Sequence, residues 1–405
     1  EDEGVLVAEI IAGQKPHIDY NCIPWVIYTD PEIAWVGKTE QQLKAAGIAY
    51  KAGQFPFAAN GRALGMARAD GFVKFLADAG MKRVVLAIEL NLHQIKEIHD
   101  ATPVELEFFV SGALCVSFSG NCYMSVANGE RSANRGSCAQ NCRLPYNLID
   151  GKGDTLIANS HLLSIKDLDL SEQLPQLIAA GIVSFKIEGR LKDVVYVKNN
   201  TSYLRKKLDA FLEGNEKYVK ASSGRILYNF EPQMDRSFNR GYTDYFANER
   251  KEKIGSWESP KSKGQIIGKL ISIKGNAYQI ENADKLKNGD GLYFLNDEGI
   301  ADGAFVNKVE NGLVYFNAPK SIANGTAIFR NLDAEFNKLV EREDSTIRKI
   351  SVKLLLSETA DGFQLKAIDE DGCESVASFV HPKEQTKNNE SIIPNIKTNL
   401  AKTGN

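Results

Sequence analysis

The sequence is poor in the patterns that most often mark a site. Only five histidines occur in 405 residues, and no H-E-x-x-H pattern is present, so a zinc-protease helix is excluded. No G-x-G-x-x-G loop is present, so we expect neither FAD nor NAD to bind. No apolar run approaches the roughly 18 residues of a membrane helix, and the acidic first residues lack the basic region of a secretory signal. We therefore expect a cytoplasmic protein with no membrane partner.

The sequence also lacks a large excess of either positive or negative charge. Lysine and arginine number 49 against 52 aspartates and glutamates, which gives a formal net charge of -3. No overall basic field therefore points to nucleic acid, although a local patch is enough to contact phosphates. With 43% hydrophobic and 25% charged residues, the composition is typical of a globular protein of several domains.

Cysteine is scarce but concentrated in one segment. Four of the six cysteines follow the spacing C-x6-C, fifteen residues, C-x3-C: Cys115, Cys122, Cys138 and Cys142. In a reducing compartment such a group indicates a metal or cluster site and not a disulfide framework. Structural zinc sites usually pair cysteines two to four residues apart, which only the second pair satisfies. The wide first pair favours a [4Fe–4S] cluster, with zinc and four unrelated buried cysteines as alternatives.

The cysteine segment carries a family resemblance. Glu107-x-Phe109-x-x-Gly112-Ala113-Leu114-Cys115, followed by Gly120-x-Cys122-x-Met124-Ser125, resembles the signature of peptidase family U32, the collagenase-like peptidases. Similar motifs follow in order over residues 134–146, 164–168, 185–192, 237–246 and 259–268. The later motifs are most similar to the subgroup that hydroxylates a cytidine of 23S ribosomal RNA, and the resemblance covers about residues 80–382.

This resemblance implies a fold and a function. The fold is a (β/α)8-like barrel, of which only the second half is expected here. The function is iron–sulfur-dependent C5-hydroxylation of a pyrimidine in ribosomal or transfer RNA, with a prephenate-type acid as co-substrate. The family name keeps a peptidase or other hydrolase as an alternative, although no histidine stands in a serine- or cysteine-protease motif.

Residues 1–79 resemble a different family. Residues 17–24, 28–45 and 55–66 are similar to the C-terminal dimerisation domain of dihydrolipoamide dehydrogenase. The resemblance implies a homodimer formed through this segment, and it predicts a chimera in which both halves are truncated. Two alternatives remain. The chain is a non-catalytic fusion relic, or it is a protein classed as a dihydrolipoyl dehydrogenase from this segment alone.

Hydrophobic patterns predict the domain order. After residues 1–79 we expect an α/β half-barrel with the cysteines over residues 80–221 and an Arg/aromatic linker over 222–263. A small β-barrel is predicted over 264–330, a helix plus β-hairpin over 331–382, and a disordered tail over 383–405. Within the first segment, Thr39 is predicted to cap a helix that stops at Gly47, followed by two antiparallel strands.

Charged residues near the predicted barrel strands are the other site candidates. Lys186, Glu188 and Arg190 end a strand, where such barrels keep their catalytic groups. Glu188 is expected to move a proton, and Arg190 with Arg135 to bind the two carboxylates of the acid. A structural salt-bridge network is the alternative for these residues. Predicted substrate-binding residues, with a packed loop as the alternative for the last three, are Arg135, Arg143, Arg236, Arg240 and Tyr242.

Overall fold

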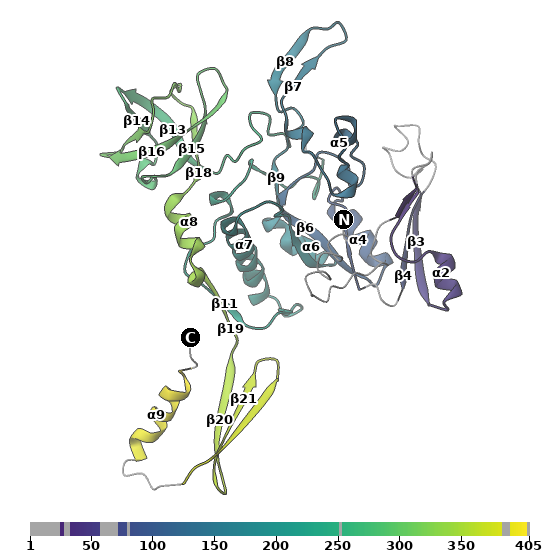
Figure 1. Ribbon diagram of the computed structural model, residues 1–405, viewed down its shortest axis with the longest axis vertical. Coiled ribbons are helices and arrows are strands. Elements are labelled where there is room, and N and C mark those ends of the chain that lie inside the picture. Colours follow the sequence, from purple (N-terminus) through teal and green to yellow (C-terminus); the bar gives the residue numbers. More distant parts are fainter. Residues whose placement is uncertain are drawn as a thin grey trace, which may run out of the picture. The chain divides into compact units, whose positions relative to one another are not determined.

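The computed structural model describes residues 25–27, 33–56, 72–78, 82–250, 253–382 and 389–402 (Figure 1). Of these, the residues within 1–87, 93–108 and 180–185 form one compact unit, and those within 88–92, 109–179 and 186–405 form another. In the described residues no helix is both long enough and apolar enough to cross a membrane. The sequence also predicts a short amphipathic helix over residues 3–13, and these residues lie outside the described part of the chain.

The first unit begins with short antiparallel pairs. Strands β1 (Trp25–Ile27) and β2 (Ile33–Trp35) pair with each other, as do β3 (Tyr50–Pro56) and β4 (Phe72–Asp78). Between them, α2 (Glu40–Ala45) starts at a capping box in which the Gln42 amide donates to Thr39 Oγ1 and the Thr39 amide donates to Gln42 Oε1. The predicted cap at Thr39 and the predicted antiparallel strands are confirmed.

A five-stranded sheet carries the site. Its strands have the order β10–β6–β9–β12, with β5 on β6. Their bounds are β5 (Arg83–Val85), β6 (Glu105–Ala113), β9 (Asp167–Asp169), β10 (Ile182–Ile187) and β12 (Tyr242–Thr243). Strand β6 runs through both units and buries Leu106, Phe108 and Val110 on alternate positions, as expected of a strand with one face in the core.

The direction of β9 corrects the expected arc of parallel strands. β5 pairs parallel with β6 and β12 parallel with β9, but β9 runs antiparallel to β6, with Ser111 opposite Asp169. A parallel neighbour would require a crossover, usually a helix, whereas the chain returns from β6 through irregular segments and the hairpin of β7 (Tyr146–Ile149) and β8 (Thr155–Ser160). The α/β class is confirmed, but a (β/α)8 barrel is not found in the described residues.

Helices connect and follow these strands. The connecting helices are α4 (Leu92–Ala101), α5 (Met124–Ala127), α6 (Leu174–Ala179) and α7 (Val194–Glu213). Short 3-10 turns are η3 (Ala133–Arg135), η4 (Asn141–Arg143), η5 (Ser171–Gln173) and η6 (Met234–Arg236). Asp193 starts α7 by accepting a hydrogen bond from the Tyr196 amide at 2.8 Å. The sequence also predicts helices over 90–99, 171–181 and 194–214, and α4, α6 and α7 overlap these ranges.

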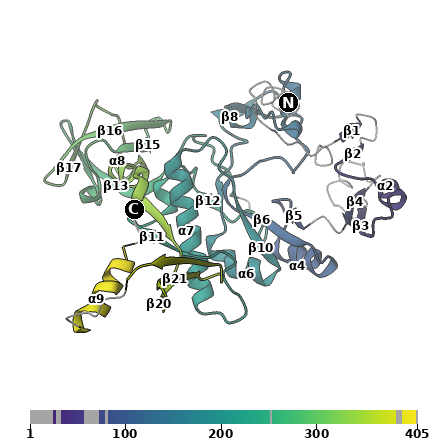
Figure 2. The same cartoon turned by 60° about the horizontal axis from the view of Figure 1, so that its bottom comes forward.

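A closed β-barrel follows in the second unit (Figure 2). Its strand order is β13–β14–β17–β16–β15–β18. Its strands are β13 (Gln265–Lys274), β14 (Ala277–Ile280), β15 (Gly291–Leu295), β16 (Ala301–Glu310), β17 (Leu313–Phe316) and β18 (Ala327–Leu332). Its core is apolar and includes Leu270, Phe294 and Val314. The small barrel predicted from alternating residues and glycine turns is thus present.

The C-terminal elements differ from the prediction. The helix α8 (Ala334–Glu341) packs through Phe336 and Val340 on Val195 of α7. Strand β11 (Arg225–Tyr228), which precedes this helix, pairs with β19 (Thr346–Lys349), which follows it. The expected hairpin is a three-stranded sheet of β20 (Val352–Thr359), β21 (Gly362–Asp369) and β22 (Glu374–Val380). The tail predicted as disordered contains α9 (Asn389–Leu400), whose apolar residues recur at helical spacing.

Candidate metal centre

The four cysteines lie in the irregular segment between β6 and β7. Cys115 follows the end of β6, Cys122 precedes α5, and Cys138 and Cys142 lie before and within η4. All four are free thiols. Burial raises the pKa of Cys115 and of Cys142. The charges of Cys122 and Cys138 raise the pKa of Cys115 further, and those of the other three thiols raise the pKa of Cys142. The structure therefore brings the four thiols into one electrostatic neighbourhood.

Short polar contacts shape the segment that carries them. The Cys122 amide donates to Asn134 Oδ1 at 2.8 Å, and the Ala139 amide donates to Ser125 Oγ at 3.1 Å. The Gln140 amide donates to Cys138 Sγ at 3.3 Å. An amide aimed at a sulfur stabilises the thiolate form, which is the form that binds metal. Hydrogen bonds within the segment therefore help to hold its fold without a metal.

Arg143 joins the two ends of the segment. Its Nη2 donates to the carbonyl of Leu114, which precedes Cys115, at 2.9 Å. Its Nη1 donates to the Ile165 carbonyl at 2.8 Å and to Ser164 Oγ at 2.9 Å. In the described part of the chain no carboxylate pairs with it. The side chain predicted to bind substrate instead holds the cysteine segment and leaves a positive charge beside Cys142 and Cys115.

In the described residues the four thiols do not converge on a single point. Within the described ranges no three cysteine, histidine or acidic side chains are close enough to hold one metal ion. Tetrahedral zinc at about 2.3 Å from each sulfur would require sulfurs about 4 Å apart. A cubane cluster holds its ligands at its corners, several ångströms apart, and takes four thiolates. Four thiolates are the donor set that a cubane cluster takes, and the described residues form no single-ion site.

The residues that end β10 lie against the same segment. Arg190 Nη1 donates to the Gly136 carbonyl at 3.0 Å, and the Arg190 amide donates to Glu188 Oε1 at 2.9 Å. Lys186 Nζ lies 4.9 Å from the centroid of the Phe109 ring. The structure therefore brings Arg190 to the cysteine segment and orients Glu188 beside it. The Arg135 side chain lies outside the described part of the chain.

The Arg/aromatic segment is packed through its charged groups. Arg240 forms a buried ion pair with Asp167, with 2.9 Å between Nη1 and Oδ1, and its Nε donates to the Pro260 carbonyl at 2.7 Å. Arg236 pairs with buried Asp333 and lies 4.2 Å from the centroid of the Phe336 ring. These contacts favour the packed-loop alternative over direct RNA contact.

Tyr242 is engaged in the same way. Its hydroxyl donates to the Met234 carbonyl at 2.9 Å, and burial raises its pKa well above the usual range. A hydroxyl already bonded inside the protein does not present a free donor to RNA. The substrate-binding role predicted for Tyr242 stays a prediction, but the geometry favours a packing role.

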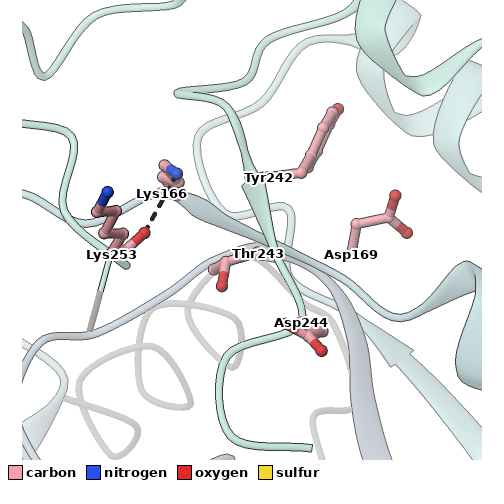
Figure 3. Close-up of a pocket in the computed structure, with 6 residues that line it drawn as sticks. All are labelled: Lys166, Asp169, Tyr242, Thr243, Asp244 and Lys253. Carbon is pink, nitrogen blue, oxygen red and sulfur yellow. Dashed lines mark hydrogen bonds between the residues drawn. The ribbon is translucent and has the colours of Figure 1, made fainter. Parts of the chain in front are cut away.

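A cavity of about 320 Å³ lies where β9 and β12 end (Figure 3). Lys166 Nζ donates to the Lys253 carbonyl at 3.2 Å on one side, and Asp169 lies on the other. The remaining lining residues are Tyr242, Thr243 and Asp244. Sequence reasoning missed this cavity, because its two lysines belong to separate segments that only pairing of the strands brings together.

Lys192 is a second residue that the sequence reasoning missed. Burial, and after it the charge of the nearby Arg240, lower its pKa to about 8. It stands in the motif over residues 185–192, directly after the charged residues that were selected. The only available signal was its position at the end of that motif.

Comparison with known proteins follows the division of the sequence. Residues 64–257 match the model of Peptidase family U32, and residues 23–91 match that of the pyridine nucleotide-disulphide oxidoreductase dimerisation domain. Two successive segments of the chain thus match two different families. The resemblances predicted for both parts of the sequence are therefore confirmed.

Individual relatives give the same division. The chain is 40% identical over 340 residues to the 23S rRNA 5-hydroxycytidine C2501 synthase of Escherichia coli (strain K12), which covers 82% of this chain and 52% of that protein. It is 30% identical over 237 residues to the tRNA hydroxylation protein P1 of Bacillus subtilis (strain 168), covering 56% of this chain and 55% of that protein.

The other part matches a different relative. The dihydrolipoyl dehydrogenase of Cupriavidus necator is 66% identical over 108 residues, covering 27% of this chain and 23% of that protein. The chain thus spans about half the length of the two hydroxylation proteins and about a quarter of the dehydrogenase.

Proposed function

We propose that the U32 segment is an iron–sulfur-dependent hydroxylase that acts on C5 of a pyrimidine in RNA and uses a prephenate-type acid as co-substrate. The observation that carries the proposal is the group of four thiols beside Arg143, whose positive charge has no carboxylate partner in the described part of the chain. Two relatives that are named for hydroxylation of ribosomal or transfer RNA support the choice of substrate.

The residues around the thiols would share the work. A [4Fe–4S] cluster held by Cys115, Cys122, Cys138 and Cys142 would supply electron transfer or Lewis acidity. Arg143 offsets the negative charge of the thiolates and keeps the first and last cysteines on one folded segment. The four ligands thereby stay in one place while substrates come and go.

The end of β10 would handle the substrates. Arg190 contacts the cysteine segment through Gly136 and is suited to bind a carboxylate of the acid. The Glu188 carboxylate, oriented by the Arg190 amide, would move a proton at the pyrimidine ring. Both side chains lie on the loop directly after the strand that neighbours β6.

A peptidase is the alternative that the family name offers. A cysteine protease needs a histidine hydrogen-bonded to its nucleophile, so that the thiolate forms at neutral pH. In the described residues no histidine is hydrogen-bonded to Cys115, and the His161 ring nitrogen Nδ1 lies 2.8 Å from the Arg143 carbonyl oxygen. Burial also raises the pKa of the Cys115 thiol, which disfavours the nucleophilic form. The hydroxylase is therefore the better proposal.

The proposal is tested by anaerobic reconstitution of the full chain with iron and sulfide. We expect a brown protein with a band at about 400 nm that disappears in the Cys138→Ala/Cys142→Ala variant. Cys373→Ala is the matched control, because Cys373 is an exposed thiol in the turn between β21 and β22. Colour retained in the double variant would refute the ligand set, and one bound zinc without a visible band would refute the cluster.

Activity is tested on RNA. The reconstituted chain is incubated with prephenate and with ribosomal RNA from cells that lack hydroxycytidine, and nucleosides are analysed by mass spectrometry. A pyrimidine that gains one oxygen atom supports the proposal. A coloured protein that leaves the RNA unchanged, or a colourless aggregate, favours the fusion relic.

The N-terminal segment has a separate proposed role. Its match to a dimerisation domain supports self-association through residues 23–91. Gel filtration with light scattering should show twice the 44.7 kDa mass of one chain. Deletion of residues 1–79 should return the remaining chain to a monomer, and a dimer that survives the deletion would contradict this role.

A further inference from the structure

Lys192 has an unusual environment in the second unit. Its Nζ lies 3.2 Å from the centroid of the Phe238 ring and 5.5 Å from that of Tyr196. Aromatic faces stabilise an ammonium group but do not neutralise its charge. In the part of the chain that the structure describes, no carboxylate lies within ion-pair distance of this nitrogen. The ammonium group is therefore partly buried with rings as its neighbours and with its charge uncompensated.

The surrounding charges already have other partners. The Arg240 guanidinium pairs with Asp167, and the Asp193 carboxylate accepts from the Tyr196 amide at the start of α7. Among the described residues, Arg143 donates hydrogen bonds only to carbonyl and hydroxyl oxygens. Burial and then Arg240 lower the pKa of Lys192 to about 8, Asp167 and Asp193 raise it, and Arg143 lowers it. An anion is the missing partner of this group of charges.

We propose that Lys192 binds a carboxylate of a small organic acid next to the thiol centre. This inference rests on the proposed function, since the acid would be its co-substrate. Two features favour a small acid over an RNA phosphate: Lys192 is partly buried, and Phe238 and Tyr196 offer ring faces on which an apolar body can pack.

The position of Lys192 places the acid near the other candidate groups. Lys192 is four residues from Glu188 on the same loop, and its amide donates to the Gly189 carbonyl at 3.0 Å. Arg143, which holds the cysteine segment, is close enough to lower the pKa of Lys192. An acid held by Lys192 would therefore lie beside the loop after β10 and near Arg143.

Anion binding should depend on pH in a defined direction. A bound carboxylate favours the ammonium form, so binding takes up a proton wherever free Lys192 is partly neutral. Because the pKa of the free group is about 8, affinity should be constant below that pH and should fall as pH rises through it.

Isothermal titration calorimetry of the full chain tests the inference, with prephenate and malonate as probes. Lys192→Met should weaken both by roughly tenfold or more, because a charge-assisted contact is lost. Lys192→Arg should retain part of the affinity. Lys206→Met is the matched control, since Lys206 lies on α7 and pairs with Glu231. The fall in affinity above pH about 8 should be present in the unmodified chain and absent in Lys192→Met.

Several results would overturn the inference. Equal affinity in Lys192→Met and the unmodified chain would do so, as would binding of neither acid to the unmodified chain. If Lys192→Met weakens binding of a single-stranded RNA oligonucleotide but not of either acid, Lys192 contacts an RNA phosphate instead. If the protein stays colourless but binds the acid through Lys192, the inference stands and the proposed function fails. If the protein is brown but its acid binding does not depend on Lys192, the proposed function stands and the inference fails.

Discussion

Gly112 packs so closely against Glu188 that only glycine fits at position 112. A Cβ on Gly112 would lie 2.2 Å from the Glu188 carbonyl oxygen, and Gly112 has a φ of +114°, a conformation that side chains disfavour. The Glu188 amide donates to the Ser111 carbonyl at 2.8 Å. This contact sets the end of the strand before Cys115 directly against the loop that carries Arg190 and Lys192.

Gly112→Ala should therefore separate these two elements. We expect a loss of at least about 2 kcal/mol of unfolding free energy, because both the backbone conformation and the contact are unfavourable for alanine. Urea unfolding followed by tryptophan fluorescence measures it. Gly151→Ala is the control, since a Cβ there meets nothing within 4 Å. Equal midpoints for the two variants would contradict the prediction.

Arg143→Met should impair the cysteine segment. The carbonyls of Leu114 and Ile165 would lose their donor, at about 1–3 kcal/mol for each group left unpaired. The positive charge beside the thiols would also disappear, so iron and sulfide content after reconstitution should fall. Arg342→Met, which removes an exposed pair with Asp344, should retain full content. Unchanged content in Arg143→Met would show that the thiols do not need this arginine.

Arg240→Met should destabilise the fold, because it leaves the buried carboxylate of Asp167 without its partner. We expect a loss of about 3–5 kcal/mol, measured as a lower urea midpoint. The Asp167→Leu/Arg240→Met double variant should recover much of the loss, since no charge then remains buried alone. If Arg240→Met is as stable as the unmodified chain but loses RNA binding, the predicted RNA contact is right and the packing role is wrong.

Glu40 should titrate far below its ordinary pKa of 4.5. Hydrogen bonds from Lys74, then from Tyr50 and Lys44, lower its pKa to about 2. Because the folded value is depressed, these contacts stabilise the folded state above pH 4.5, and the contribution is lost as pH falls towards 2. The carboxyl carbon resonance of labelled glutamate measures the midpoint. Lys74→Met should raise it, and a midpoint near 4.5 in the unmodified chain would contradict the prediction.

Local patterns predicted the elements but not all of their partners. Thr39 and Gln42 form the expected cap because a capping box involves residues three apart. In the small barrel, β13 with β14, β15 with β16 and β16 with β17 likewise pair with the next strand in the sequence, whereas the pairs that close the barrel do not. The antiparallel β9 could not be foreseen, because strand direction depends on how the long segment between β6 and β9 returns to the sheet. The helix over 389–400 was missed because polar residues dilute its apolar spacing.

The sequence alone determined the two family segments and the group of four cysteines, because ordered motifs and spacing along the chain need no third dimension. Only the tertiary structure decided what the arginines do. Arg143, Arg236 and Arg240 looked equally available as substrate contacts, yet folding brings each to oxygen atoms far away in the sequence. Lys192 is the opposite case, because folding surrounds it with rings and gives it no carboxylate partner in the described residues. Partners distant in sequence, set by strand pairing and burial, decide which charges remain free for a ligand.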